Sequence, residues 1–154
     1  MFEKVVSGGQ TGVDRAALDM ALALGIPCGG WCPQGRSAED GMLAPRYPLT
    51  ATPSTDYAQR TEWNVRDSDG TLVLTRGTPA GGTAYTIEVA GQLGRPCLVL
   101  DLRRTPSVAT VRVWAQQHGV RVVNVAGPRE SVQPGIYGDA AVFLRQVLTA
   151  LTPP

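Results

Sequence analysis

The sequence predicts a single-domain α/β fold, a three-layer sandwich around a parallel sheet of about five strands. Short apolar runs alternate with helical periodicities along the chain, and glycine-rich turns follow two of these runs. Strands separated by single helices need crossover connections, so we expect a parallel sheet with helices on both faces. The chain has 154 residues and 43% hydrophobic content, which suits one core, so residues 1–154 are expected to form one domain.

The first half of the chain predicts a strand, a helix and a long connection. Residues 4–7 form the expected strand, and the helix after the glycine loop is ended by Gly25 and Pro27. A short extended piece surrounds Cys28, and residues 33–53 are rich in Pro, Gly, Ser and Thr. Loops of that length are usually functional or mobile, and this one suits a lid that carries Arg36, Arg46 and Tyr47. The core-facing side of the helix is predicted to consist of Val13, Ala16, Ala17, Met20, Ala21 and Leu24.

In the second half of the chain, predicted helices and strands alternate more regularly. Residues 56–67 predict a helix with Ser54 or Thr55 as its cap, and residues 70–75 predict a buried strand. A helix from Thr83 to about Leu93, a strand at 96–102, a helix opened by Thr105-Pro106 and ended by Gly119, and a strand at 120–127 should follow. One face of the last helix contains Ala140, Leu144, Val147, Leu148 and Leu151.

Composition excludes several classes of protein. The net charge is +1 without a basic block, which argues against a nucleic-acid surface. No apolar run approaches the roughly 20 residues of a membrane helix, so a cytoplasmic protein without membrane association is expected. Three cysteines and one histidine make a four-ligand zinc site improbable, and no metal-ligating residues are predicted.

The glycine loop after the first strand is the first candidate anion site. Small residues let backbone amides approach a phosphate, and the helix that follows adds the positive end of its dipole. The loop lacks the Lys-Ser/Thr ending of an ATPase loop and the full dinucleotide pattern. The alternative is a tight turn in which Asp14 and Arg15 cap and pair structurally. The candidate residues are Gly8, Gly9, Gln10, Thr11, Gly12 and Asp14.

A second glycine-rich turn follows the central strand and opens a helix by the same logic. Its candidates are Arg76, Gly77, Gly81, Gly82 and Thr83, and two such turns at neighbouring strand ends can hold one phosphorylated ligand. Glu88 lies further along that helix. Its carboxylate is a ligand contact, an acid/base group or a partly buried structural carboxylate.

Two further segments add candidates. Tyr57, Arg60, Asn64 and Asp67 recur on one helix face, which serves a ligand or is simply solvated. Gly127 and Arg129 follow the last strand, where the arginine could hold an anion or remain an exposed turn residue.

Taken together, four motifs resemble the molybdenum carrier (molybdenum cofactor carrier-like) family. They are GGQTGVDRAALDMAL, RTEWNVRDSDGTLVL, GTPAGGTAYTIEVA and NVAGPRES, and they cover nearly the whole chain in order. This family looks like a branch of the Rossmann-like superfamily of lysine decarboxylase-like, cytokinin-activating proteins. The resemblance implies a Rossmann-like fold, a pterin-phosphate or nucleotide-like ligand with molybdenum cofactor (molybdopterin) as the carried ligand, and a homo-oligomer, dimer or tetramer.

The related phosphoribohydrolases carry P-G-G-x-G-T-x-x-E, and the corresponding stretch here runs from Pro79 to Glu88. Only one glycine pair precedes Thr83, and the spacing to Glu88 is longer than in that pattern. The catalytic arginine of those enzymes has only Arg60 and Arg66 as candidate counterparts.

Two hypotheses follow from these motifs. The first is a non-catalytic carrier, in which both glycine loops hold a phosphate while Arg60, Asn64 and Glu88 contact the ring or ribose. The second is a nucleoside-monophosphate N-glycosidic hydrolase, in which Glu88 is the catalytic carboxylate. We favour the carrier, because the catalytic motif is degraded while both glycine loops are intact. A protein with oligomer contacts alone would leave these loops unexplained.

Overall fold

The computed structural model describes residues 1–154, which build a five-stranded parallel sheet in the order β2-β1-β9-β7-β8. The strands are β1 (Lys4–Val6), β2 (Cys28–Gly29), β7 (Gly70–Thr75), β8 (Cys97–Asp101) and β9 (Val122–Ala126). Every pairing between them is parallel. The predicted fold class, a Rossmann-like α/β sandwich around about five parallel strands, is confirmed.

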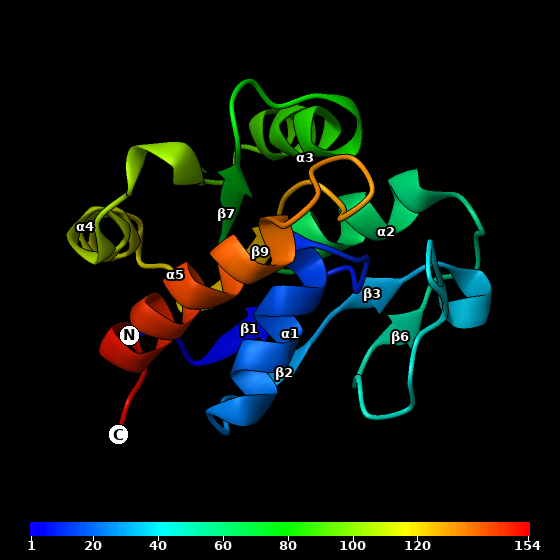
Figure 1. Ribbon diagram of the computed structural model, residues 1–154, viewed down its shortest axis with the longest axis horizontal. Coiled ribbons are helices and arrows are strands. Elements are labelled where there is room, and N and C mark those ends of the chain that lie inside the picture. The colour runs from blue at the N-terminus through cyan, green and yellow to red at the C-terminus, as the bar shows by residue number, and fades with distance from the viewer.

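Five α-helices cover the two faces of this sheet (Figure 1). On one face, α1 (Val13–Ala23), α4 (Val108–His118) and α5 (Ile136–Leu151) pack on strand residues such as Leu72, Leu74 and Val125. On the other face, α2 (Tyr57–Arg66) and α3 (Gly81–Gln92) meet through Val65, Val89 and Ala90. The main core therefore lies between the sheet and the α1, α4 and α5 layer.

The first and last strands of the chain pair in the interior of the sheet. Val5 of β1 is in register with Val123 of β9, and both side chains are fully buried. The chain ends also meet, since the Phe2 amide donates to the Leu151 carbonyl over 2.6 Å. No helix in the structure combines the length and the apolar character that a membrane crossing requires.

Several predicted boundaries move by one to three residues. The α2 cap is Asp56, whose carboxylate accepts from the Ala58 amide over 2.9 Å, so the prediction of Ser54 or Thr55 is wrong. Ser54 instead accepts from the amide of Asp56. Helix α3 begins at Gly81, two residues before the prediction. Helix α4 is capped by Ser107, because Thr105 is left-handed and ends a short 3-10 turn at Leu102–Arg104.

The connection at 33–53 is more ordered than the irregular loop predicted. Together with Trp31 and Cys32 it forms two pairs of short strands, β3 (Trp31–Cys32) with β6 (Thr50–Ala51) and β4 (Ser37–Ala38) with β5 (Gly41–Met42), and a 3-10 turn at Gln34–Arg36. The Arg36 guanidinium donates to three carbonyls of this segment. A small core of its own packs the segment on α1 through Leu18, Cys32, Leu43, Tyr47 and Leu49.

Candidate functional site

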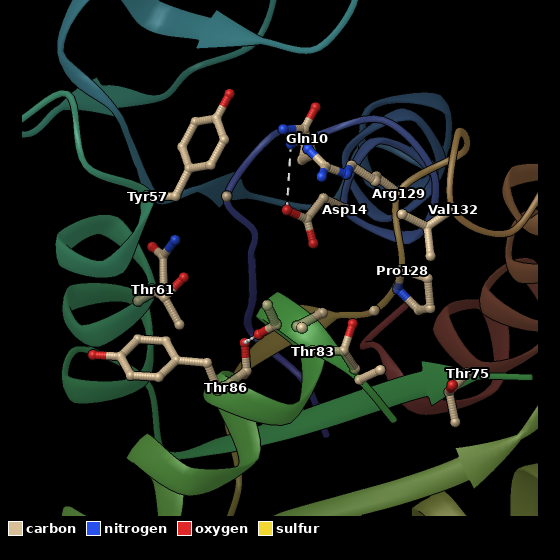
Figure 2. A pocket seen from close by; sticks show the side chains of 18 of the residues that line it. Gln10, Asp14, Tyr57, Thr61, Thr75, Thr83, Thr86, Pro128, Arg129 and Val132 are labelled. Carbon is tan, nitrogen blue, oxygen red and sulfur yellow. Dashed lines mark hydrogen bonds between the residues drawn. The ribbon is translucent and has the colours of Figure 1, made fainter. Parts of the chain in front are cut away.

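A cavity of about 440 Å³ opens at the carboxyl ends of β1, β9 and β7. Its wall comes from the turn after β1, the inner face of α2, the start of α3 and the loop after β9. Parallel α/β sheets bind ligands at this edge, and the volume falls within the roughly 300–1,000 Å³ of small-molecule pockets. Figure 2 shows side chains from these segments pointing into one space. No residue between 33 and 53 lines it, so the segment predicted as a lid forms no part of the wall.

The turn that opens α3, residues 76–83 and here the α3 turn, presents free backbone amides to this cavity. The N–H groups of Gly81, Gly82 and Thr83 have no acceptor within the protein, and Ala80 makes no side-chain cap. Gly81 has a φ of 52°, and a Cβ on Gly81 or Gly82 would meet nothing within 4 Å. Packing of the protein against itself therefore does not require small residues here. Unpaired amides and the positive end of a helix dipole are the features with which helix N-termini favour anions.

In the turn after β1, residues 7–14 and here the β1 turn, more of the backbone amides are paired within the protein. The amides of Gly9, Gln10 and Thr11 donate to Ser7 Oγ, Asp14 Oδ2 and Gln10 Oε1 over 3.3, 3.3 and 3.0 Å. The Val13 amide donates to the Pro128 carbonyl over 3.3 Å. These four amides already have acceptors within the protein and are not free for a phosphate, whereas the amides of Gly8, Gly12 and Asp14 have none.

Two glycines of the β1 turn are explained by close packing. Gly12 has a φ of 78°, and a Cβ there would overlap the Pro128 carbonyl oxygen and lie 2.9 Å from Arg129 Cα. Gly9 shares that φ of 78° and faces the Leu49 and Leu43 side chains. Gly127 approaches the Leu74 carbonyl and Val13 in the same way. The loops after β1 and β9 therefore touch through their backbones.

Asp14 is the only carboxylate in the cavity wall. Its residue is 7% exposed, and burial raises its pKa to about 6, against the opposing influence of Arg60, the Gln10 amide and Arg15. Oδ2 accepts from Gln10 (dashed line in Figure 2), whereas Oδ1 has no partner in the protein. Oδ1 is not sealed in, because the one buried side-chain oxygen or nitrogen without a hydrogen bond belongs to Gln59.

The two predicted polar residues of α2 lie in the wall and contact other segments. Arg60 is 9% exposed and donates from Nη1 to the Gly8 carbonyl over 2.8 Å. Asn64 accepts from the Trp31 amide over 2.7 Å and donates to the Trp31 carbonyl over 3.0 Å, so its amide fastens α2 to β3. The Arg60 guanidinium also lies 4.9 Å from the centre of the Tyr57 ring.

The remaining predicted residues divide between the wall and its supports. Of all those proposed, Gly8, Gln10, Asp14, Arg60, Asn64, Gly81, Gly82, Thr83, Gly127 and Arg129 line the cavity, while Gly9, Thr11, Gly12, Arg76, Gly77 and Glu88 do not. Arg76 pairs with Asp139, and Gly77 donates to Asp101 over 3.1 Å. Glu88 accepts from Gln92 of the next helical turn over 3.2 Å.

A hydrogen-bond network around Glu39, here the Glu39 network, connects the β4–β5 hairpin to the loops after β1 and β9. Glu39 accepts from the Ser131 hydroxyl over 2.5 Å and pairs with the Thr11 hydroxyl. The Thr11 oxygen in turn accepts from the Glu130 amide over 3.1 Å. Arg129, which lines the cavity, lies 3.6 Å from Glu39.

Sequence reasoning missed the polar side chains that complete the wall. Two of them, Thr75 and Asn124, stand near the carboxyl ends of β7 and β9, and a polar residue inside an apolar run was the pattern that could have revealed them. The others are Thr61, Thr78, Tyr85, Thr86 and Gln133. Within the whole chain, no group of three His, Cys, Asp or Glu side chains is placed to hold a metal ion.

These features define a Rossmann-like α/β protein with a polar cavity at the carboxyl edge of its sheet. Residues 5–148 match the Circularly permutated YpsA SLOG family (cpYpsA), and the chain belongs to that family. The pairing of the first and last strands, and the meeting of the chain ends, are arrangements that tolerate circular permutation.

A solved structure agrees with this assignment. The chain is similar to the putative molybdenum carrier protein from Syntrophus aciditrophicus SB, a crystal structure at 1.45 Å, with 47% sequence identity and a TM-score of 0.89. The match covers 95% of this chain and 94% of that one. None of the curated proteins matches the chain.

Proposed function

We propose that this protein binds a phosphorylated nucleotide- or pterin-type molecule in the cavity and holds its phosphate at the start of α3. The observation that carries the proposal is the set of three free amides at Gly81, Gly82 and Thr83, which face a cavity large enough for such a ligand. Arg129 adds a cation to the same wall. A helix N-terminus with unpaired amides favours an anion through both hydrogen bonds and its dipole.

Molybdenum cofactor is the cargo we propose, because the similar solved structure is described as a molybdenum carrier. The residues present fit such a ligand, since the free amides suit its phosphate and the polar wall suits a ring system. The cofactor brings its metal on its own dithiolene, so the protein's residues need to bind only the phosphate and the ring. The chain's share of the work is therefore to bind, orient and shield the cargo.

Carriage without turnover is the better supported activity. The hydrolase hypothesis assigns the chemistry to Glu88, which lies outside the cavity wall and bonds to Gln92. A general acid or base must come within hydrogen-bond reach of the substrate. No other observation favours hydrolysis at Glu88, and we propose no reaction there.

A charge placed at the α3 turn tests this proposal. Gly82→Asp puts a carboxylate into open space at a helix N-terminus, where it suits the helix dipole and repels a phosphate. Gly82→Asn is the matched neutral control. Calorimetry with molybdopterin, GMP and AMP should show binding to the wild type, at least a tenfold loss in the aspartate variant and a much smaller loss in the asparagine variant.

Two results would overturn the proposal. One is the absence of any binding heat for all three ligands at high micromolar concentration. The other is equal affinity in the aspartate and asparagine variants, which would place the phosphate elsewhere.

A further inference from the structure

The cavity has two chemically different ends. The α3 turn follows β7 and presents amide donors, whereas the β1 turn follows β1 and presents the Asp14 carboxylate. Strand β9 lies between β1 and β7, so the two ends are separated by two strand spacings, roughly 10 Å. A ligand whose phosphate binds at α3 therefore meets Asp14 with its far end.

Asp14 is unusual because its ionised form is buried yet incompletely paired. Oδ2 receives the Gln10 amide over 3.3 Å, but Oδ1 receives nothing from the protein. The charged groups that face it are Arg60 from α2 and Arg15 on its own helix, and neither forms an ion pair with it. Oδ1 is open to the cavity, so this carboxylate oxygen is an acceptor available to a ligand donor.

Arg60 stands beside this carboxylate and offers the opposite chemistry. A Cβ built on Gly8 would lie 2.8 Å from Arg60 Nη1 and 3.0 Å from Asp14 Oδ2, so the two side chains converge on that glycine. Nη1 donates to the Gly8 carbonyl, while Nε and Nη2 make no hydrogen bond within the protein. The pair therefore presents free donors next to a free acceptor.

Asn124 adds a second acceptor to the floor of the cavity. It is 3% exposed and in register with Val6 of β1, and its Nδ2 donates to Thr71 Oγ1 over 3.2 Å. Its Oδ1 has no partner in the protein and lines the same space. Asn124 thus adds an unpaired acceptor to the part of the cavity between its two ends.

We propose that Asp14 and Arg60 recognise the edge of a 2-aminopyrimidin-4-one ring, the ring that guanine and pterins share. Such an edge presents a carbonyl oxygen, a ring N–H and an exocyclic amino group, which match a guanidinium donor beside a carboxylate acceptor. Adenine presents an amino group and a ring nitrogen acceptor at the same places, so it mismatches both side chains. A ribose hydroxyl is a poorer candidate for Asp14, because it stands only a few bonds from the phosphate.

This inference rests on the proposed function, because the phosphate at α3 sets the position of the ring. Calorimetry at pH 8 distinguishes recognition of the ring from binding of the phosphate. The ligands are GMP, dihydroneopterin monophosphate, AMP, dGMP and ribose 5-phosphate. We expect GMP or the pterin phosphate to bind at least tenfold more tightly than AMP, and the tighter of the two identifies the source of the ring.

The variant Asp14→Asn should lose most of this preference while it still binds ribose 5-phosphate. Asp40→Asn is the matched control, because Asp40 pairs with Arg15 over 2.9 Å and lies outside the cavity wall. It should keep the wild-type preference. A thermal melt confirms that each variant is folded.

The wild type alone supplies a test that needs no variant. The ratio of GMP to AMP affinity should fall as the pH drops below about 6, because protonation of Asp14 removes an acceptor. Phosphate ionisation cancels in this ratio, since both ligands carry the same group.

Three results overturn the inference and leave phosphate binding intact. They are equal affinity for GMP and AMP, an unchanged preference in Asp14→Asn, and a loss on going from GMP to dGMP that matches the loss in Asp14→Asn. The last result would assign Asp14 to the ribose. Failure of every probe, ribose 5-phosphate included, would instead overturn the proposed function itself.

Discussion

The two glycine turns of this protein look alike in sequence and differ in their surroundings. In the β1 turn, a Cβ on Gly12 would collide with the backbone at Pro128, and consecutive amides have protein acceptors. In the α3 turn, Gly81 and Gly82 face open space, and their amides have no acceptor. A glycine can therefore be required by the protein's own packing, as in the β1 turn, or can leave space that a ligand could fill, as in the α3 turn. The room around the missing side chain distinguishes the two cases.

The substitution Gly12→Ala should have the largest effect. It forces a residue with a side chain to a positive φ and against the Pro128 carbonyl, at a combined cost of about 2–5 kcal/mol in the free energy of unfolding. Urea unfolding followed by circular dichroism measures this loss. A change below about 1 kcal/mol would mean that the two loops do not depend on their close contact.

The variant Asp14→Asn should stabilise the protein in a pH-dependent way. The folded protein holds a proton on Asp14 up to pH of about 6, whereas the ordinary carboxyl releases it near 3.8. Wild-type stability is therefore lost as pH rises through this window, and the variant escapes that loss. The gain should be small at pH 4 and reach at most about 3 kcal/mol above pH 7.

Chemical denaturation of both proteins at pH 4, 6 and 8 measures that gain. A variant that is less stable than the wild type at pH 8 would show that the ionised carboxylate is well satisfied in the folded protein. Such a result would mean that the Asp14 carboxylate is as well paired within the protein as the Gly9, Gln10 and Thr11 amides of the β1 turn.

Disruption of the Glu39 network should have a moderate effect on the free energy of unfolding. Hydrogen bonds from Ser131 and Thr11 lower the pKa of Glu39, so its contribution is present above the ordinary carboxyl pKa and is lost as the pH falls. Glu39→Gln should cost about 1 kcal/mol at neutral pH and almost nothing in acid. Thermal melts at two pH values check this, and an equal loss at both would exclude a role for the charge.

The substitution Gly82→Ala should have the smallest effect, between zero and a gain of about 0.5 kcal/mol. Its Cβ meets nothing, and alanine lowers the entropy of the unfolded chain. Urea unfolding alongside Gly12→Ala gives the direct contrast between the two turns. A loss above about 1 kcal/mol would show that the α3 turn also needs its glycines for folding.

The fold and the place of the cavity could be predicted from local patterns. The alternation of apolar runs and helical periodicities is a property of neighbouring residues, and it located all five strands of the main sheet. The rule that ligands bind at the carboxyl edge of parallel strands then selected loops that line the cavity. The short strands at 31–51 escaped prediction because two-residue pairings depend on partners rather than on periodicity.

Roles within the site could not be predicted in the same way. Asn64 and Arg60 were predicted as ligand contacts and line the cavity, but their hydrogen bonds to Trp31 and Gly8, which are distant in sequence, were not foreseen. Asp14 and Glu88 were both predicted as site carboxylates, and only Asp14 lies in the cavity wall. A side chain's role depends on which partners lie within hydrogen-bonding distance, and those partners come from other elements.

The sequence by itself determined the layered α/β architecture, the strand-to-helix glycine turns and the lack of a cationic or membrane-spanning segment, because these follow from composition and short-range periodicity. Only the tertiary structure decided which turn keeps most of its amides free. It placed β9 between β1 and β7, brought Pro128 against Gly12 and left the start of α3 open. Availability of a hydrogen-bonding group depends on every neighbour in space, and parallel strands bring together neighbours far apart in sequence.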